Sequence, residues 1–151
     1  MALVLTPIML LFIFSTGAYD PYRWGMYINA WRDMSPIAFY GKVVDEKGAP
    51  LGDATVDIRI HVVNLTFILG ADAPLKAERF TVSTDAHGCF AITGKQGKSL
   101  YVDGVHKPGY IYNYTDNPKS AFLYYQGSTI HHADSKSPVT FTVRHVDHQT
   151  G

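Results

Sequence analysis

Two short turn signals dominate this sequence, and each borders residues that favour β-strands. The segment Thr84–Ile92 reads T-D-A-H-G-C-F-A-I: Asp85 opens a turn, Gly88 follows three residues later, and an apolar alternation begins at once. A near-copy of the turn lies upstream at Asp45–Gly48. An aspartate can bond the backbone of its own turn, and a glycine tolerates positive φ, so both segments specify tight turns. Paired turns of this kind predict an antiparallel, all-β fold.

The residues between these turns alternate with a period of two. Even positions from 54 to 62 carry apolar side chains, whereas Thr55, Asp57, Arg59 and His61 occupy odd positions. This pattern predicts a strand with one face in water. Strand signals recur in short segments along the chain, with a loop expected at Gly94 and Gly97: 38–44, 54–63, 77–83, 89–93, from 100 onward, 121–125 and 139–146. About seven short strands are typical of a β-sandwich.

The first 18 residues resemble an export signal in composition. Residues 2–14 are apolar except for Thr6 and Pro7, and small residues follow as far as Ala18, which suits signal-peptidase cleavage. The apolar run is too short for an ordinary transmembrane helix, which needs about 20 residues. No Lys or Arg precedes Arg23, so the positive region typical of such signals is missing. We expect residues 1–18 to be a signal peptide or a short membrane anchor, and the protein to be extracytoplasmic: periplasmic, at the cell surface or secreted.

Residues 19–37 form a second zone that is rich in aromatic side chains. Asp20-Pro21 favours the start of a helix, and Ser35-Pro36 favours its end. Four large side chains recur at helical spacing and predict one helical face: Trp24, Tyr27, Trp31 and Met34. We interpret this zone as an aromatic helical lead-in to the β domain. A juxtamembrane amphipathic helix and an aromatic platform for sugars are the alternatives.

Charge and cysteine content exclude several classes of function. The 151 residues carry no net charge, and only 17% of them are charged, with no basic block. Binding to nucleic acid or to a membrane by electrostatics therefore has no support. Cys89 is the one cysteine, so no intramolecular disulfide can form, and we interpret it as a small apolar side chain in or near the core. After Ala18 no apolar run could span a membrane, so membrane contact is expected only through the N-terminal segment.

The order of these motifs resembles that of carboxypeptidase regulatory-like domains, in particular the exported bacterial type. Gly41–Val56 is similar to the family's opening G-x-V-x-D-x-x-G-x-P-L-x-G-A-x-V, and Thr84–Phe90 is similar to its T-D-x-x-G-x-F. Later segments resemble its following strand, its x-x-G-Y turn and its closing N-P-V-x-F-x-L strand: Leu100–Val102, Lys107–Tyr110 and Ser137–Val143. Together these motifs cover about residues 38–146.

The resemblance implies a seven-stranded, transthyretin-like Greek-key sandwich over residues 38–147, followed by a tail at 148–151. It also implies that the motif residues are structural and that the domain has no catalysis and no cofactor. Aspartates would bond turn amides, glycines would permit positive φ and aromatics would pack: Asp45, Gly48, Asp85, Gly88, Phe90, Gly109 and Tyr110. Asp53 departs from the pattern, since the family usually has Gly at that position.

Metal binding and hydrolysis find little support in the sequence. His131 and His132 are adjacent, and His145 and His148 are three apart, so on a strand each pair would face opposite sides. We interpret these histidines as solvated loop or tail residues, and we expect no metal. Loop aspartates lack the spacing of an EF-hand: Asp45, Asp53, Asp72, Asp116 and Asp134. A transthyretin-related hydrolase of 5-hydroxyisourate is less favoured, because its closing Y-R-G-S has only the Y-Q-G-S at residues 125–128 as a counterpart.

We therefore expect a non-enzymatic exported module with a structural or protein-interaction role. Its partner would be another protein or a cell-envelope component. The alternative is a carbohydrate-binding module, because the flat faces of exposed aromatic rings suit sugar rings. The tyrosines near one predicted loop region are the candidates for ligand binding: Tyr110, Tyr112, Tyr114, Tyr124 and Tyr125. Ordinary packing of these rings in strands is the competing interpretation.

Overall fold

A computed structural model describes residues 20–69, 73–117, 119–125 and 127–146. Its contacts divide the chain into two compact units, one of residues 1–32 with 63–76 and one of residues 33–62 with 77–151. The expected signal or anchor at 1–18 and the expected tail at 148–151 lie outside the described residues. In the parts of the chain that are described, no helix is long and apolar enough to cross a membrane.

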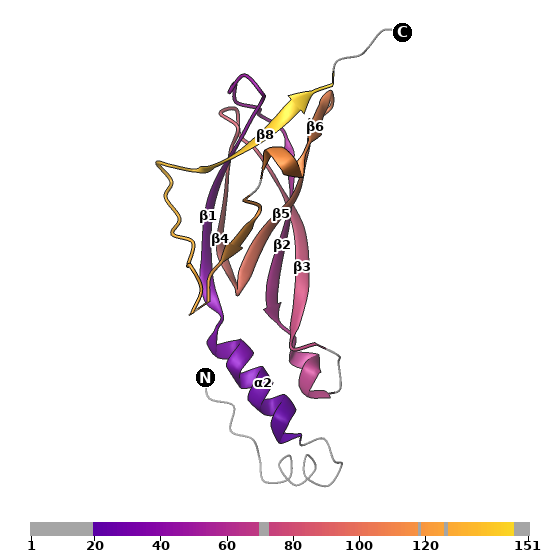
Figure 1. Cartoon of the computed structure of the whole chain (residues 1–151), viewed down its shortest axis with the longest axis vertical. Helices are drawn as coiled ribbons and strands as arrows, with labels where there is room; N and C mark the ends of the chain where they lie inside the picture. The colour runs from indigo at the N-terminus through magenta and orange to yellow at the C-terminus, as the bar shows by residue number, and fades with distance from the viewer. Residues whose placement is uncertain (1–19, 70–72, 118, 126, 147–151) are drawn as a thin grey trace. The chain divides into compact units, whose positions relative to one another are not determined.

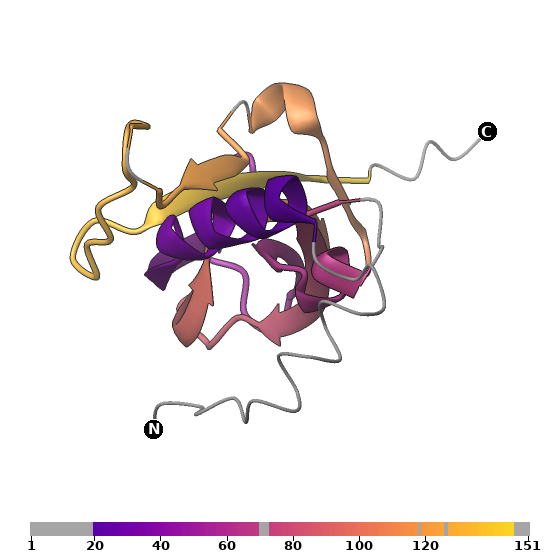
Figure 2. The same cartoon turned by 90° about the horizontal axis from the view of Figure 1, so that it is seen from below.

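The first unit contains the helix α2 (Pro21–Arg32) and the short 3-10 helix η1 (Leu65–Leu69), which lie beside each other (Figures 1 and 2). The helix begins where the sequence predicts, because the Asp20 carboxylate accepts a hydrogen bond from the Tyr22 amide at 2.9 Å, as expected of an N-cap. Arg23 connects the two helices: its guanidinium donates to the Phe67 carbonyl at 2.9 Å and lies over the Phe67 ring.

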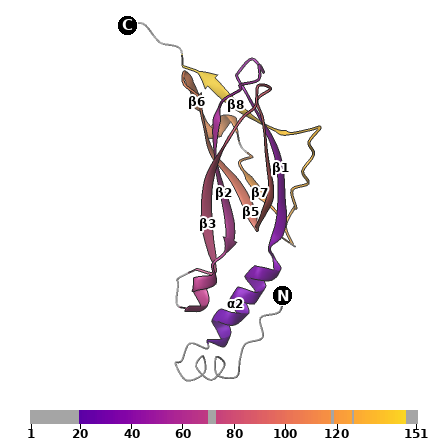
Figure 3. The same cartoon turned by 180° about the vertical axis from the view of Figure 1, so that it is seen from behind.

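Eight β-strands among the described residues form two four-stranded sheets (Figures 1 and 3). The first sheet has the order β4-β1-β8-β6, with β1 (Ser35–Val44), β4 (Cys89–Gly97), β6 (Tyr110–Tyr112) and β8 (Val139–His145). The second has the order β3-β2-β5-β7, with β2 (Thr55–Val63), β3 (Leu75–Ser83), β5 (Ser99–His106) and β7 (Ala121–Leu123). The expectation of about seven strands is one too few, because Tyr110–Tyr112, which begins at the last residue of the Lys107–Tyr110 turn, pairs with β8 as β6.

The inner faces of both sheets share one hydrophobic core, so the fold is a β-sandwich. On β2 the alternation predicted from the sequence is confirmed, since Val56, Ile58 and Ile60 are each at most 1% exposed. The rings of four phenylalanines from four strands meet at the centre: Phe39, Phe90, Phe122 and Phe141. Burying each such side chain stabilises the fold by roughly 1.5–3 kcal/mol.

Strand β4 does not end at Thr93, as the sequence suggested, but continues through Gly94 to Gly97. Ile37 of β1 pairs with Lys95, whereas Phe39 pairs with Ile92, so β4 contains one extra residue between these pairs. Gly94 has φ of 72°, which fits a bulge with glycine in the left-handed region. The glycine therefore bends a continuing strand instead of ending it.

The two Asp-x-x-Gly turns have the same hydrogen bonds. The Asp45 carboxylate accepts from the amides of Lys47 and Ala49, and the Asp45 carbonyl accepts from Gly48. The Asp85 carboxylate likewise accepts from His87 and Cys89, and its carbonyl accepts from Gly88. Gly48 and Gly88 have φ of 82° and 73°. Each aspartate thus fastens the turn that it opens, as the pattern predicts.

Thr84 joins the two turns to each other. Its buried hydroxyl donates to the Leu51 carbonyl at 2.7 Å and accepts from the Ala54 amide at 2.9 Å. Its main chain bonds both Asp53 and Ala54. The segments 45–54 and 84–88 are the connections from β1 to β2 and from β3 to β4, so Thr84 links two places where the chain passes from one sheet to the other.

The glycines of the two turns should differ in what they tolerate. A Cβ on Gly48 would meet nothing within 4 Å, whereas a Cβ on Gly88 would lie 2.4 Å from the Val43 carbonyl oxygen. Gly48→Ala should lower the free energy of unfolding by about 1 kcal/mol, because alanine is strained in the left-handed backbone conformation. Gly88→Ala should cost at least about 1 kcal/mol more, because the backbone must also shift. Urea denaturation of both variants measures this, and equal losses would contradict the close approach at Gly88.

Candidate functional site

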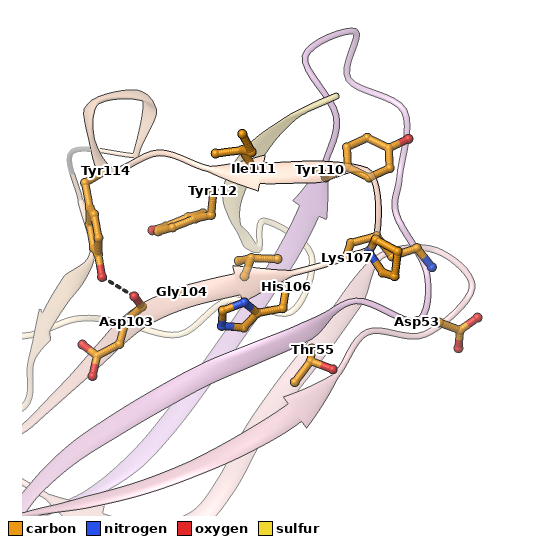
Figure 4. A pocket seen from close by; sticks show the side chains of 12 residues that line it. Asp53, Thr55, Asp103, Gly104, His106, Lys107, Tyr110, Ile111, Tyr112 and Tyr114 are labelled. Carbon is orange, nitrogen blue, oxygen red and sulfur yellow. Dashed lines mark hydrogen bonds between the residues drawn. The ribbon is translucent and has the colours of Figure 1, made fainter. Parts of the chain in front are cut away.

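The second unit contains an open pocket of about 640 Å³, where β5 turns into β6. Residues of β5 and the start of β2 form one side of the pocket, and β6 with the following 3-10 helix η2 (Tyr114–Asp116) forms the other. Figure 4 shows three tyrosine rings along the β6 side, with Asp103, His106 and Thr55 across from them. The pocket thus combines aromatic surface with ionisable and hydroxyl groups.

The turn at Lys107–Tyr110 creates this pocket. The Tyr110 amide donates to the Lys107 carbonyl at 3.0 Å, and Gly109 has φ of 82°, as the third residue of a type II turn requires. The Lys107 ammonium donates to the Gly52 carbonyl at 2.7 Å, which ties the turn to the β1–β2 connection. The turn places β6 at the edge of the first sheet. There β6 pairs with β8, with Tyr110 opposite His145 and Tyr112 opposite Val143.

The three tyrosines of the pocket differ in exposure. Tyr110 and Tyr112 share one face of β6 and are half-buried, because both pack against the edge of the core. Tyr114 is 56% exposed, meets Tyr112 edge to face at 5.3 Å between ring centroids, and donates its hydroxyl to the Asp103 carbonyl. This bond fixes the Tyr114 ring at the end of the pocket. A ligand that packs on the ring face would therefore restrict the side chain only slightly further, and little side-chain entropy would be lost on binding.

The Tyr112 hydroxyl is the unusual polar atom of the pocket. It is buried, and no hydrogen-bond partner for it is found among the described residues. Burial, followed by the nearby Tyr114 and Asp103, raises the pKa of Tyr112 to about 12. The phenol is therefore neutral near pH 7 and can both donate and accept a hydrogen bond. A buried hydroxyl without a partner costs free energy, so water or a ligand hydroxyl is the natural partner here.

Two side-chain pairs connect β2 with β5 beside the pocket. Asp57 contacts the His106 imidazole at 2.6 Å, and both side chains are exposed. Arg59 binds both carboxylate oxygens of Asp103 at 2.8 Å, and its guanidinium lies 4.5 Å from the centre of the Tyr101 ring. The Asp103 carboxylate raises the pKa of Arg59. These pairs fix the two members that line the pocket, Asp103 and His106.

The sequence predicts the exposed position of one residue in each pair, but not its partner. Alternation alone places Asp57 and Arg59 on the wet face of their strand. Their partners on β5 remain hidden, because they follow from a strand pairing with a register shift after Asp57. Gly104 is a local sign of this bulge, since an isolated glycine inside a strand often marks one, but it does not reveal which residues of β2 lie opposite.

The structure separates the five tyrosines that the sequence groups together. Tyr110, Tyr112 and Tyr114 line the pocket, but Tyr124 and Tyr125 do not. Tyr124 is only 4% exposed and donates its hydroxyl to the Ala38 carbonyl, so the expectation that its ring is exposed is wrong. Tyr125 is half-buried beneath the Lys98 ammonium, which also pairs with Asp33. Alternation explains the error, because the inward face of the β7 region continues through Phe122 to Tyr124.

The described residues hold no group of three or more side chains suited to a metal ion. Two of the aspartates considered for calcium already have other partners, since Asp45 bonds its turn and Asp116 pairs with Arg144. Asp72 and His148 lie outside the described residues. Cys89 is half-buried, and its sulfur lies 3.7 Å from the His87 carbonyl oxygen.

Comparison with known proteins gives no family for this chain. No protein-family model and no curated protein matches the sequence. Among solved structures, the chain is similar to the crystal structure of 3-chlorocatechol 1,2-dioxygenase from Rhodococcus opacus 1CP, with 16% sequence identity and a TM-score of 0.46. The similarity covers 74% of this chain and 60% of that one, so the chain spans less than two thirds of the dioxygenase. A likeness this low carries no argument about activity.

His131 is not the solvated residue that the sequence suggests, because its ring packs on three core rings. The imidazole lies 4.9 Å from Phe122, 5.3 Å from Phe39 and 5.8 Å from Tyr124 between ring centroids. Its Nε2 is buried without a partner among the described residues. Burial, and then the charges of Lys119 and His132, lower the pKa of His131.

The free energy of unfolding should therefore fall as the pH falls below about 6.5. In that range the unfolded chain binds a proton at His131 that the folded chain resists, so stability present above the unfolded pKa is lost on acidification. His131→Phe should keep the ring packing and flatten the pH profile of the melting temperature between pH 8 and pH 5. Some slope should remain, because burial also lowers the pKa of His61. The control His132→Gln should keep most of the parent's slope, because the charge of His132 is the smallest of the three causes that lower the pKa of His131. A parental slope in His131→Phe would contradict the assignment.

Proposed function

We propose that this chain is a non-enzymatic β-sandwich module with a structural or protein-interaction role outside the cytoplasm, of the carboxypeptidase regulatory-like kind. One observation carries the proposal: the residues of the resemblance are all engaged in folding. Asp45 and Asp85 bond their turns, Gly88 permits a close backbone approach, and Phe90 lies in the core. Such residues define a scaffold, and the function of a scaffold resides in the surfaces that it carries.

Two features support the finer assignment to a transthyretin-like Greek-key sandwich. In the first sheet, β1 lies between an antiparallel β4 and a parallel β8. Asp53, where the family usually has Gly, has φ of 53°. The left-handed backbone that a glycine would favour is therefore present, and aspartate is one of the residues that adopts it with modest strain.

The pocket beside β6 is the surface best suited to a partner. It is open, it presents the exposed Tyr114 ring and the exposed Ile111, and its charged groups are held in place by pairing. Aromatic side chains with a polar end contribute strongly to protein interfaces. A protein or another component of the cell envelope is the partner that this surface fits best.

Photo-crosslinking tests this role at the pocket. A benzophenone amino acid replacing Ile111, which is 55% exposed at the pocket, should form one defined crosslinked product in an envelope extract of the source organism. The same group replacing Ile130, which is exposed and outside this pocket, is the matched control. Products from both positions, or from neither, would contradict an interaction site at β6.

Carbohydrate binding is the second candidate function, favoured by the tyrosines and hydrogen-bonding groups of the pocket. Stacking on the Tyr114 face would leave sugar hydroxyls near the Tyr112 hydroxyl and near the Asp57–His106 pair. Carboxylates and imidazoles accept hydrogen bonds from hydroxyls, and the aromatic face covers the apolar side of a sugar ring.

Affinity electrophoresis through gels that contain polysaccharides tests this candidate. Retardation of the parent on one polysaccharide should fall by roughly tenfold in affinity for Tyr114→Ala, because a stacking ring is worth about 1–1.5 kcal/mol. Tyr125→Ala, which changes a tyrosine outside the pocket, should keep the retardation. Absence of retardation of the parent on every polysaccharide would remove the carbohydrate function and leave the protein-interaction role in place.

A further inference from the structure

A second pocket of the sandwich, of about 420 Å³, lies beside β7. Its walls are Lys119, the strand β7 itself and the segment 129–132, and we call this space the histidine pocket. Ile130 forms a parallel β-bridge with Leu123, and the His131 amide donates to the Leu123 carbonyl at 2.8 Å. These backbone contacts fix the segment 129–132 against β7, so the two walls are held in place.

The ionisable side chains that line the histidine pocket are all basic. Lys119 places its ammonium 5.7 Å from the centre of the Phe122 ring, and His132 is exposed at the pocket. Burial, and then the charges of Lys119 and His132, lower the pKa of His131. Positive charges have this effect only on a nearby group, so the three basic side chains act on one another. Together they make the pocket attractive to an anion.

The acidic residues nearest in the sequence have other partners. Asp116 pairs with Arg144 at 2.7 Å. The Asp134 carboxylate accepts a hydrogen bond from the Lys136 amide at 2.8 Å. Among the described residues, no acidic side chain lines the histidine pocket, and no ion pair includes a residue that lines it. The positive charge of the pocket is therefore open to a ligand.

Apolar surface lies next to these basic groups. Phe122 belongs to the core, Leu123 is half-buried and Ile130 is 40% exposed, and all three line the pocket. Hydrocarbon that covers such side chains is removed from water, which favours binding. A ligand that fits both features combines one negative charge with a short hydrocarbon part.

We propose that the histidine pocket binds a small organic carboxylate that carries a short hydrocarbon chain. The carboxylate lies among the basic groups of Lys119, His131 and His132, and the chain covers Leu123 and Ile130. An ionised carboxylate only accepts hydrogen bonds, whereas an ammonium only donates them, and such charge-assisted bonds are strong. The inference is independent of the pocket beside β6, because the two pockets share no lining residue.

A titration of the full chain with butyrate tests the proposal by NMR. Chloride keeps the ionic strength constant, so that screening does not change during the titration. Butyrate should shift the imidazole signals of His131 and the amide signals of residues 129–132 in a saturable way. The affinity should rise by roughly twofold to fourfold for each methylene from acetate to butyrate. Butyramide, which has a similar shape but no charge, should bind at least about tenfold more weakly.

Lys119→Gln should weaken the binding of butyrate by about fivefold to tenfold, because it removes the charge of one donor. The matched control is Lys136→Gln, which removes an exposed lysine that does not line the pocket and should leave the affinity unchanged. Ile130→Ala should keep the affinity for acetate but lose most of the gain from acetate to butyrate. Circular dichroism of the three variants shows whether they are folded.

The binding of butyrate should also strengthen as the pH falls from about 8 to about 6, because histidines gain charge in this range. Lys119, His132 and the phenol of Tyr124 are the ionisable groups around His131. Burial raises the pKa of Tyr124, so this phenol stays neutral. A bound carboxylate favours the charged imidazole, so saturation with butyrate should raise the pKa of His131. The same coupling makes the affinity depend on pH.

Several results would overturn the proposal. Equal affinities for butyrate and butyramide would show that the basic groups do not take part. Equal affinities for acetate and butyrate, or an affinity for inorganic phosphate that matches the one for butyrate, would reduce the pocket to an unselective anion site. An unchanged affinity in Lys119→Gln, or the absence of saturable shifts at His131, would place the carboxylate elsewhere.

Discussion

The hydrogen bonds of Thr84 are the constraint on which the sandwich depends. One buried hydroxyl donates to Leu51 and accepts from Ala54, and the main chain adds two further bonds to the same segment. Breaking this set would leave buried backbone groups without partners, which costs more than the bonds themselves contribute. The two connections between the sheets are thereby held together, and the Gly88 carbonyl, which accepts from Val43, extends the contact into β1. The relative placement of β1, β2 and β4 follows from this junction.

A glycine of β1 and a phenylalanine of β4 pack against each other beside this junction. Gly41 of β1 lies opposite Phe90 of β4, and a Cβ on Gly41 would come within 2.2 Å of the Phe90 ring. The ring occupies the space that a side chain would need, so one motif supplies the gap and the other supplies the ring that fills it. Both residues belong to segments that carry the resemblance.

Local chemistry was predictable from the sequence, and long-range pairing was not. The helix start at Asp20, the two turns and the alternation of β2 each depend on residues close together in the chain. The continuation of β4 through Gly94 depends on its register with β1, which the composition of the segment does not reveal. The burial of Tyr124 likewise depends on a core assembled from distant strands, and its aromatic ring alone is compatible with either side of a sheet. The pocket inherits this limit, because its Asp103 and His106 are held by partners 44 and 49 residues away in the chain.

A buried amide, Asn117, holds the far end of the segment that carries the tyrosines of the pocket. Strand β6 pairs with β8 over only three residues, which gives a short ribbon little stability of its own. The Asn117 side chain donates to the Thr142 carbonyl at 2.8 Å and accepts from the Thr142 amide at 2.7 Å, so it bonds β8 as the backbone of a neighbouring strand would. It also donates to the Asn113 carbonyl, which closes the segment around η2. The tyrosines therefore lie on an addition to the sandwich that is fixed at its far end by Asn117 and at Tyr114 by the bond to Asp103. A binding surface placed there can change its ligand without disturbing the junction at Thr84.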